Sequence, residues 1–365
     1  MLRRKFFVKT AAITLSANLL GIKEIFAQTQ CPAPLPVTST GINCVEEIKS
    51  LRVVSGPYTG AYEIAPNGLS NWYFTNLGLT PIIQYLSLAD LDKYIRTYLD
   101  LYLNKLEPDL SIKDINFPFG RANQSSFTLV LSDSDDSYAA TFLTLVSRYL
   151  SASQNWTWWD QNKQKLKDLA YRNLALAVKP NGLTSVFQSP RNQTNNSGYL
   201  MDNCEVYRGL RDFSTLLRAR NDIDGANYFG AFATGISTSL AGLFVQINGA
   251  FRISDNTPLT EKSFYPGTTC QVFPQVFGVT ELAPYFDRAW NFLSVNSVGW
   301  EKGGLDPFPF AVVGFAAAKR GQNLLAQTQI ASMDKLFVTN RALMTINELG
   351  FYQRTKSILS GRLDI

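Results

Sequence analysis

The sequence of 365 residues contains no histidine. This absence excludes catalytic triads and dyads that need an imidazole, and it excludes zinc or iron sites built on histidine. Acid–base chemistry near neutral pH must then use carboxyl groups, tyrosine, lysine or cysteine. Among common reactions, glycoside hydrolysis and polysaccharide elimination are the most compatible with a lack of histidine. Glycoside hydrolysis uses paired carboxyl groups.

A strong excess of positive charge is also missing. The formal net charge is +5, and residues 1–27 hold five cationic residues against one acidic residue, which leaves about +1 for the rest of the chain. Domains that bind nucleic acid carry a strongly basic surface, so we exclude nucleic acid as a partner. The apolar fraction of 45% and the charged fraction of 17% are typical of a globular protein.

Residues 1–27 have the form of an export signal. Adjacent Arg3 and Arg4 precede a mildly apolar stretch, 10–22, which is too short to span a bilayer, and 25–27 is a passable cleavage site. The segment resembles a twin-arginine signal, with an ordinary secretory signal as the alternative. Both predict a periplasmic or secreted protein without a membrane span in the mature chain.

Cysteine is scarce, with four residues in the whole chain. An even number in an exported protein favours disulfides, of which three pairings are possible. We favour Cys31–Cys44 and Cys204–Cys270. The absence of any CxxC spacing argues against a metal site made of cysteines alone, and we expect neither a metal nor a cofactor.

Helical periodicity dominates the chain after residue 60. We expect 28–60, rich in Pro, Thr and Gly, to form an irregular arm and 61–365 to form one all-α domain. The expected helices are 71–86, 88–106, 134–150, 160–179, 199–220, 223–245, 281–295, 307–319, 323–336 and 341–349, with a short piece after Gln271. Consecutive antiparallel helices of this number form a closed (α/α)6 toroid or an open solenoid, and the lack of a fixed repeat disfavours the solenoid.

Three acids stand at the start of the expected helix 134–150. Asp133, Asp135 and Asp136 follow a long loop and precede an apolar run. One acid is enough to cap a helix, with Asp133 or Ser134 as the N-cap, and the acids also complement the helix dipole. Three acids in this position favour a functional site, in which Asp135 and Asp136 are candidates for binding the substrate.

The segment Asp133-Ser-Asp135-Asp-Ser-Tyr138-Ala139 resembles the signature of glycoside hydrolase family 8, with Tyr138 in place of Met or Ile. The resemblance implies an (α/α)6 barrel, an inverting glycosidase, and an active-site role for Asp133, with Asp135 as the second signature acid. The family places its general acid in a Ser-Glu-Gly-x-Gly-Tyr segment. That segment is absent here, and the equivalent stretch, 62–73, holds Glu63 as its only acid.

Three further segments supply candidate residues. Asp202 and Glu205 lie near the start of the helix 199–220, although Glu205 also has the spacing of a surface ion pair with Arg208. Asp306 is a fourth candidate acid, or the N-cap of a helix with proline at its first position. The aromatic and amide candidates for binding sugar rings are Trp72, Tyr138, Tyr207, Tyr265 and Gln271.

These observations predict an exported protein that acts on a polysaccharide or oligosaccharide, as a monomer. The leading hypothesis is hydrolysis, with Asp133 and Asp202 as the first catalytic candidates and Glu63 and Asp306 next. A lyase with Tyr207 or Tyr265 as its base is a variant. The alternatives are a non-catalytic glycan-binding or assembly protein on the same scaffold, and a structural or protein-binding helical domain.

Overall fold

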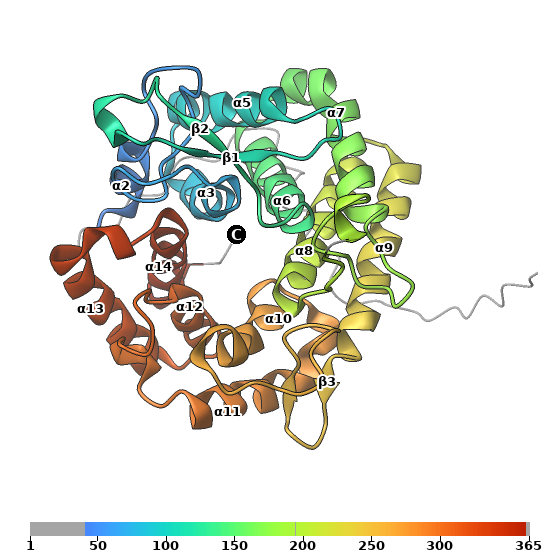
Figure 1. Cartoon of the computed structure of the whole chain (residues 1–365), viewed down its shortest axis with the longest axis vertical. Coiled ribbons are helices and arrows are strands. Elements are labelled where there is room, and N and C mark those ends of the chain that lie inside the picture. Colours follow the sequence, from blue (N-terminus) through green and yellow to red (C-terminus); the bar gives the residue numbers. More distant parts are fainter. Residues whose placement is uncertain (1–40, 194, 363–365) are drawn as a thin grey trace, which may run out of the picture.

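Six inner helices form a closed ring in the computed structural model, which describes residues 41–193 and 195–362 (Figure 1). They are α3 (Trp72–Leu79), α6 (Asp136–Ser153), α8 (Leu200–Ala219), α10 (Phe273–Val276), α12 (Ala311–Lys319) and α14 (Ile346–Leu359). Each packs against the next, and α14 packs against α3. The predicted all-α toroid is therefore confirmed.

A second layer of helices surrounds this ring. Its members are α5 (Thr97–Lys105), α7 (Trp156–Ala170), α9 (Ile223–Ala241), α11 (Phe286–Asn296), α13 (Asn323–Thr339) and α2 (Cys44–Ser50). The first five each follow their inner helix in the chain. The exception is α2, which comes before the ring in sequence and packs against α14, the last inner helix. The two ends of the domain thereby close the toroid.

The helix α2 corrects the expectation of an irregular arm over 28–60. Asn43 caps it by accepting a hydrogen bond from the backbone N–H of Glu46, and the side chains of Cys44, Val45 and Ile48 are buried. A seven-residue helix leaves little periodicity in a segment rich in Pro, Thr and Gly, so composition concealed it. Residues 28–40 lie outside the described part of the chain, as does the expected export signal.

Short turns and hairpins connect the helices. The strands are β1 (Lys113–Asn116), β2 (Thr128–Leu131), β3 (Phe244–Val245) and β4 (Ala250–Phe251). β1 and β2 pair antiparallel, as do β3 and β4. The short helical turns are η1 (Thr80–Tyr85), α4 (Leu88–Asp90), η2 (Leu91–Arg96), η3 (Gly120–Ala122), η4 (Tyr171–Ala175), η5 (Arg191–Gln193), η6 (Phe264–Thr268), η7 (Thr269–Val272), η8 (Thr280–Tyr285), η9 (Trp300–Lys302) and η10 (Arg341–Leu343).

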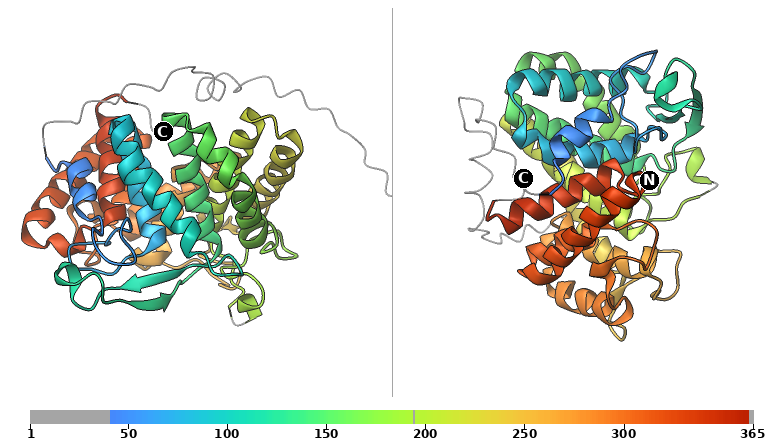
Figure 2. Two further views of the ribbon diagram at one scale, coloured as in Figure 1. Left: turned by 90° about the horizontal axis from the view of Figure 1, so that it is seen from above. Right: turned by 90° about the vertical axis from the view of Figure 1, so that its left-hand side faces the viewer.

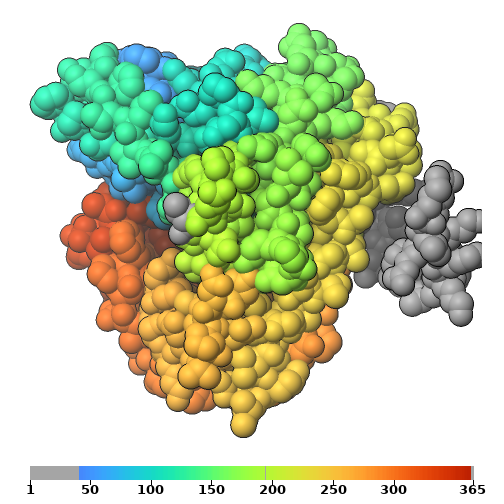
Figure 3. Space-filling model, turned by 45° about the vertical axis from the view of Figure 1, so that its right-hand side comes forward, coloured from blue at the N-terminus to red at the C-terminus, as the bar shows by residue number. Residues whose placement is uncertain are grey.

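The inner helices all begin at the same end of the ring, because an antiparallel outer helix separates each from the next. We call this end the mouth. Figure 2 shows that the β1–β2 hairpin lies at the mouth. The loops 107–131, 177–193 and 255–263 stand around a recess in the space-filling view (Figure 3). The positive ends of the helix dipoles therefore converge on one surface.

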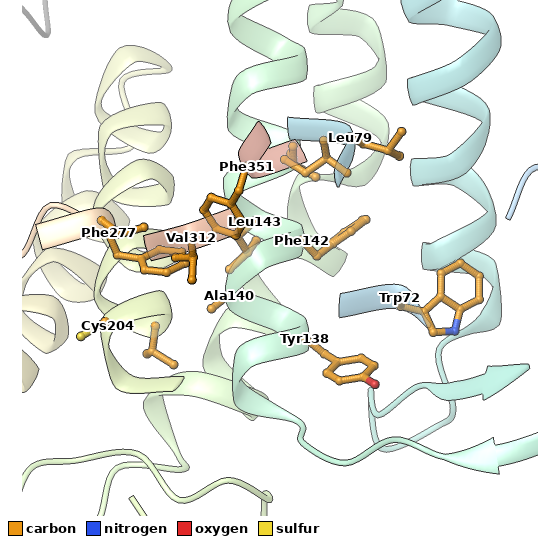
Figure 4. Close-up of a cluster of buried hydrophobic side chains, with 14 of the residues drawn as sticks. Trp72, Leu79, Tyr138, Ala140, Phe142, Leu143, Cys204, Phe277, Val312 and Phe351 are labelled. Atoms are coloured by element: carbon orange, nitrogen blue, oxygen red, sulfur yellow. The ribbon is translucent and has the colours of Figure 1, made fainter. Parts of the chain in front are cut away.

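Aromatic side chains fill the space between the two layers. Tyr102 stacks on Phe142 with ring centroids 3.8 Å apart, and Trp72 meets Tyr102 edge to face at 5.4 Å. Figure 4 shows part of this core, with residues from several inner helices converging within the ring. Within the described residues, no helix is long and apolar enough to cross a membrane.

The predicted disulfide Cys204–Cys270 is wrong. Both thiols are free and buried, and the Cys270 thiol donates to the carbonyl oxygen of Gly267 at 3.2 Å. They act as small apolar core side chains, a role that an even cysteine count does not reveal. Cys44 is also a buried free thiol, and Cys31, its predicted partner, lies outside the described residues.

The inner ring is tight enough that single methyl groups matter. A Cβ placed on Gly209 of α8 would lie 2.5 Å from the carbonyl oxygen of Ala140 in α6. We expect Gly209→Ala to lower the free energy of unfolding by about 1–3 kcal/mol, because α8 must move away from α6. Gly235→Ala in α9 is the matched control, since nothing lies within 4 Å of its Cβ position. Urea denaturation of both variants checks this, and equal stabilities would contradict it.

Candidate active site

Five carboxyl groups gather at the mouth, and we call them the acidic cluster: Asp114, Asp133, Asp136, Asp202 and Glu205. Asp136 and Asp202 occupy the first turns of α6 and α8, where the inner helices begin. The charges of the cluster act on one another, because each of Asp114, Asp136, Asp202 and Glu205 has a pKa raised first by burial and then by a neighbouring acid. The fold therefore joins acids that are far apart in the sequence.

Asp133 is the exposed member of the acidic cluster. It does not cap α6, because Asp135 occupies the N-cap position. After burial, the charge of Asp133 is the main influence that raises the pKa of Asp202, which reaches about 7. The capping interpretation of Asp133 is thus not what the structure shows, and its carboxyl group is open to solvent.

Asp136 and Asp202 form a closely interacting pair. Burial and the charge of Asp202 together hold the pKa of Asp136 well above its usual range. Asp136 is fully buried and accepts hydrogen bonds from the Thr184 hydroxyl group at 2.7 Å and from the Ser137 backbone N–H at 2.8 Å. Its position is fixed on the wall of the site, while Asp202 stays partly exposed.

Asp114 joins the cluster from the strand β1. It accepts hydrogen bonds from the backbone N–H of Trp72 at 3.1 Å and from the Asn71 amide at 2.8 Å, and so covers the start of α3. The Tyr138 hydroxyl group also donates to it at 2.7 Å. Burial raises the pKa of Asp114 to about 7, and the charge of Asp133 adds to this effect.

Glu205 lies one turn beyond Asp202 and is almost completely buried. Its Oε1 accepts a hydrogen bond from the Tyr73 hydroxyl group at 2.7 Å, while its Oε2 has no hydrogen-bond partner. Burial, then the charge of Asp202, raise the pKa of Glu205 well above its usual range. Tyr73 in turn stacks on Tyr138, with ring centroids 5.9 Å apart.

An aromatic shelf borders the acidic cluster. Tyr265 is 50% exposed and stacks on Phe310 at 4.9 Å, and Phe264 meets Phe310 edge to face. The charges of Asp202 and Asp133 reach the Tyr265 hydroxyl group, because after burial they raise its pKa most. Phe310 has a φ of 49°, a strained conformation for a bulky residue, and such strain clusters at functional sites.

Asp135 and Asp306 border the site in different ways. Asp135 is buried and pairs with Arg191 at 2.6 Å, and Arg191 also lines a cleft of about 390 Å³ beside the β1–β2 hairpin. Asp306 accepts a hydrogen bond from the backbone N–H of Phe308 at 3.0 Å. It forms a local turn before α12 and does not cap it, since the helix begins only after Pro309.

Most of the residues predicted to bind the substrate are buried, and the side chains of Trp72 and Gln271 also bond groups outside the acidic cluster. The other buried ones are Asp135, Asp136, Tyr138, Glu205 and Tyr207. Trp72 is fully buried, and its indole N–H donates to the carbonyl oxygen of Lys113 at 2.8 Å. Gln271 is buried, and its side-chain amide accepts a hydrogen bond from the backbone N–H of Phe251 and donates one to the carbonyl oxygen of the same residue. Neither side chain has a surface that a sugar ring can reach. Amphipathic residues at helix starts and in aromatic loops look alike in sequence whether they face the core or the solvent.

Two further predicted residues lie apart from the acidic cluster. Glu63 is fully buried and binds Arg121 at 2.8 Å and Gln124 at 3.2 Å, which fixes the loop around η3. Tyr207 donates its hydroxyl proton to Glu281 at 2.8 Å. The structure thus unites Asp133, Asp136, Asp202, Glu205, Tyr138 and Tyr265, and leaves Glu63 and Tyr207 outside.

Sequence reasoning missed Asp114, Tyr73 and Phe310. Asp114 stands alone in a short strand with no neighbouring acid, so no local pattern marks it. Tyr73 follows Trp72 in a helix that reads as core. Tertiary contacts bring Asp114 and Tyr73 to the mouth, since Tyr138 of α6 donates to Asp114 and Tyr73 donates to Glu205 of α8. Phe310 joins them from the start of α12.

The raised pKa values predict how stability depends on pH. Asp114 and Asp202 have pKa values of about 7 in the folded protein, against 3.8 ordinarily, so the folded state holds these protons more tightly than the unfolded chain. Stability therefore falls as the pH rises from about 4 to about 7 and then levels off. Between pH 5 and pH 7 the free energy of unfolding should decrease in both proteins. We expect the decrease to be about 2–3 kcal/mol smaller in Asp114→Asn than in the wild type.

Urea denaturation at the two pH values measures this difference. The exposed Asp224 in α9 supplies the control, and Asp224→Asn should lose as much stability as the wild type. If the stability of Asp114→Asn also decreases as much as that of the wild type, Asp114 does not titrate between pH 5 and pH 7.

Glycosidases are among the solved structures with a similar fold. No known family profile and no curated protein matches the sequence. A glycosidase in complex with glucose aligns with a TM-score of 0.58 at 12% identity, over 94% of this chain and 98% of that one. The rhamnosidase from Klebsiella oxytoca with rhamnose bound aligns with a TM-score of 0.55 at 12% identity, over 90% of this chain and 66% of that one.

A third similar structure is the GH78-family rhamnosidase of Bacillus sp. GL1, with a TM-score of 0.50 at 14% identity. This chain spans about a third of that rhamnosidase, since the alignment covers 82% of this chain and 36% of the other. At these identities the likeness shows the fold alone. The chain therefore has the helical toroid fold found in glycosidases.

Proposed function

We propose that this protein is a glycoside hydrolase that acts on a polysaccharide or oligosaccharide, and that it works in the periplasm or outside the cell. The observation that carries the proposal is the combination of an exposed carboxyl group, Asp133, with a second one, Asp202, whose pKa is raised to about 7. Glycoside hydrolysis needs one carboxylate and one carboxylic acid that is still protonated near neutral pH. The glycosidase-like fold supports the proposal.

In the proposed reaction Asp202 is the general acid. It donates its proton to the glycosidic oxygen as the bond to the anomeric carbon breaks, and the leaving group departs as an alcohol. Asp133 is the carboxylate that takes a proton from the attacking water, which follows the inversion implied by the resemblance to family 8. Burial, and then the charge of Asp133, raise the pKa of Asp202 to about 7 and so favour its protonated form.

The aromatic shelf is the proposed platform for the sugar rings. Tyr265 offers an exposed ring face next to the acidic cluster, and Phe310 supports it from below. A flat aromatic face binds the apolar side of a sugar ring through its C–H groups. The cleft beside Arg191 then extends the surface along which a longer chain lies.

The direct test is a screen of the purified protein against β-linked and acidic polysaccharides for new reducing ends. We expect activity on at least one, and we expect it to vanish in the double variant Asp133→Asn/Asp202→Asn. Activity that persists at the wild-type level in the double variant overturns the site assignment. Product stereochemistry, followed by NMR, tests inversion separately.

The burial of most of the acids favours a second candidate function, non-catalytic glycan binding. Asp114, Asp136 and Glu205 are engaged by Asn71, Thr184 and Tyr73, as expected for acids that shape a rigid surface. In that case isothermal titration calorimetry detects binding of a polysaccharide that no assay shows to be cleaved, and Tyr265→Ala weakens the binding.

A further inference from the structure

Tyr138 occupies the position at which the signature of glycoside hydrolase family 8 has Met or Ile, and the proposed function gives it no role. It lies in the first turn of α6, and its ring points toward the β1–β2 hairpin (Figure 4). The side chain is 1% exposed, and the ring stacks on Tyr73 with centroids 5.9 Å apart. A hydroxyl group at this depth needs hydrogen-bond partners, which an apolar side chain does not.

The partners of the Tyr138 hydroxyl group are two carboxyl groups and one amide. It donates to Asp114 at 2.7 Å and also shares a hydrogen bond with Asp133. The Asn71 amide donates to its oxygen at 2.6 Å. A phenol has a single proton, so the two carboxyl groups share one donor. The hydroxyl group therefore bridges a buried acid of the acidic cluster and its exposed acid.

Asp114 does not depend on this donor. It also accepts hydrogen bonds from the backbone N–H of Trp72 at 3.1 Å and from the Asn71 amide at 2.8 Å. Asn71 is itself fixed, because its side-chain oxygen caps the start of α3. The start of α3 and the strand β1 therefore hold the oxygen of Tyr138 in place, and its proton can turn to Asp133 without leaving Asp114 unbonded.

We propose that Tyr138 is a positioning residue, whose hydroxyl group holds the Asp133 carboxylate in the orientation in which it takes a proton from the attacking water. This inference rests on the proposed function, in which Asp133 is the base. An exposed aspartate samples several rotamers unless a hydrogen bond selects one, and a base must be held within hydrogen-bond reach of the proton that it removes. Asp133 lies in the loop before α6, so its bond to Tyr138 ties the base to the rigid ring.

Crystal structures of the wild type and of Tyr138→Phe at high resolution test the positioning without an activity assay. The substitution keeps the stacked ring, and Asp114 keeps its bond to Asn71. We expect the Asp133 carboxylate to adopt one conformer, bonded to the hydroxyl group, in the wild type and to be displaced or in several conformers in the variant. An unchanged single conformer in the variant, or several conformers in the wild type, overturns the proposal. If Tyr138→Phe does not fold, Tyr138→Met, the residue of the family signature, replaces it.

A double-mutant cycle measures whether Tyr138 acts through Asp133. Tyr138→Phe should lower kcat by about 10–10²-fold and change KM little, because a misdirected base slows the chemical step and not the binding of substrate. In the Asp133→Asn background the same substitution should lower kcat no further. Tyr352→Phe is the matched control and should leave kcat unchanged, since this buried tyrosine donates to a carboxyl group outside the acidic cluster, Asp334, at 2.6 Å.

The outcomes separate the role of Tyr138 from the proposed function. If Tyr138→Phe lowers kcat by the same factor in both backgrounds, Tyr138 does not act through Asp133 and the positioning role is overturned alone. A wild-type kcat in Asp133→Asn overturns both, because Asp133 is then not the base. If the wild type cleaves no glycan, the proposed function fails, and the crystal structures decide whether Tyr138 holds Asp133.

Discussion

Replacing Asp202 by asparagine is expected to lower kcat/KM on the natural polysaccharide by about 10²–10⁴-fold. The amide keeps the size of the side chain but cannot deliver a proton to the leaving oxygen. The loss should be much smaller on an aryl glycoside with an acidic phenol as its leaving group, because such a group departs without protonation. Initial rates on both substrates measure the difference.

The pH profile gives an independent check of Asp202. Its pKa of about 7 should set the alkaline limb of kcat/KM, since the reaction needs the protonated form. This limb should disappear in Asp202→Asn. Asp224→Asn, an exposed acid on an outer helix, controls for a general change of charge. If kcat/KM of Asp202→Asn decreases equally on the polysaccharide and the aryl glycoside, and the alkaline limb is unchanged, Asp202 is not the general acid.

Replacing Asp133 by asparagine is expected to lower kcat/KM by a similar factor, about 10²–10⁴-fold, but equally on both substrates. The lost carboxylate activates water, and this step is needed whichever group leaves. Asp133 is exposed, and Tyr138, with which it shares a hydrogen bond, is also held by Asp114 and Asn71, so the substitution should leave the free energy of unfolding almost unchanged. Steady-state rates and urea denaturation of the same preparation separate the two effects.

Azide distinguishes a base from a merely structural carboxylate at this position. Azide attacks carbon without deprotonation, so it should restore part of the activity of Asp133→Asn on the aryl glycoside and yield a glycosyl azide. It should not restore Asp202→Asn on the polysaccharide, where protonation of the leaving group is missing. A failure of azide to act on Asp133→Asn, together with a lowered stability of that variant, would assign Asp133 a structural role.

The sequence by itself was enough to predict the class of fold. Helical periodicity is a local property, because residues three and four apart share one face, and the spacing of Leu88, Leu91 and Ile95 already shows it. The closure of the ring was not predictable in this way. It depends on the contact between α2 (Cys44–Ser50) and α14 (Ile346–Leu359). These segments lie some 300 residues apart, and nothing in the local sequence of either indicates that it packs against the other.

The same distinction between local sequence and tertiary packing applies to the acids at the mouth. Asp133 and Asp202 were predictable, since acids at the start of a helix stand out in the sequence and inner helices of a toroid start at one end. Which acids are exposed and which are buried depended on tertiary packing. It placed Glu63 against Arg121, and it brought Asp114 from a two-stranded hairpin to the Tyr138 hydroxyl group.

The sequence thus determined the helical architecture, the absence of imidazole chemistry and the first two candidate acids, because composition and helical spacing are carried by neighbouring residues. The tertiary structure alone decided that Trp72 and Gln271 belong to the core, that Cys204 and Cys270 remain thiols, and that the Tyr138 hydroxyl group meets two acids. Burial, pKa and charge balance depend on residues that are distant in sequence and close in space, and these quantities exist only once the ring has closed.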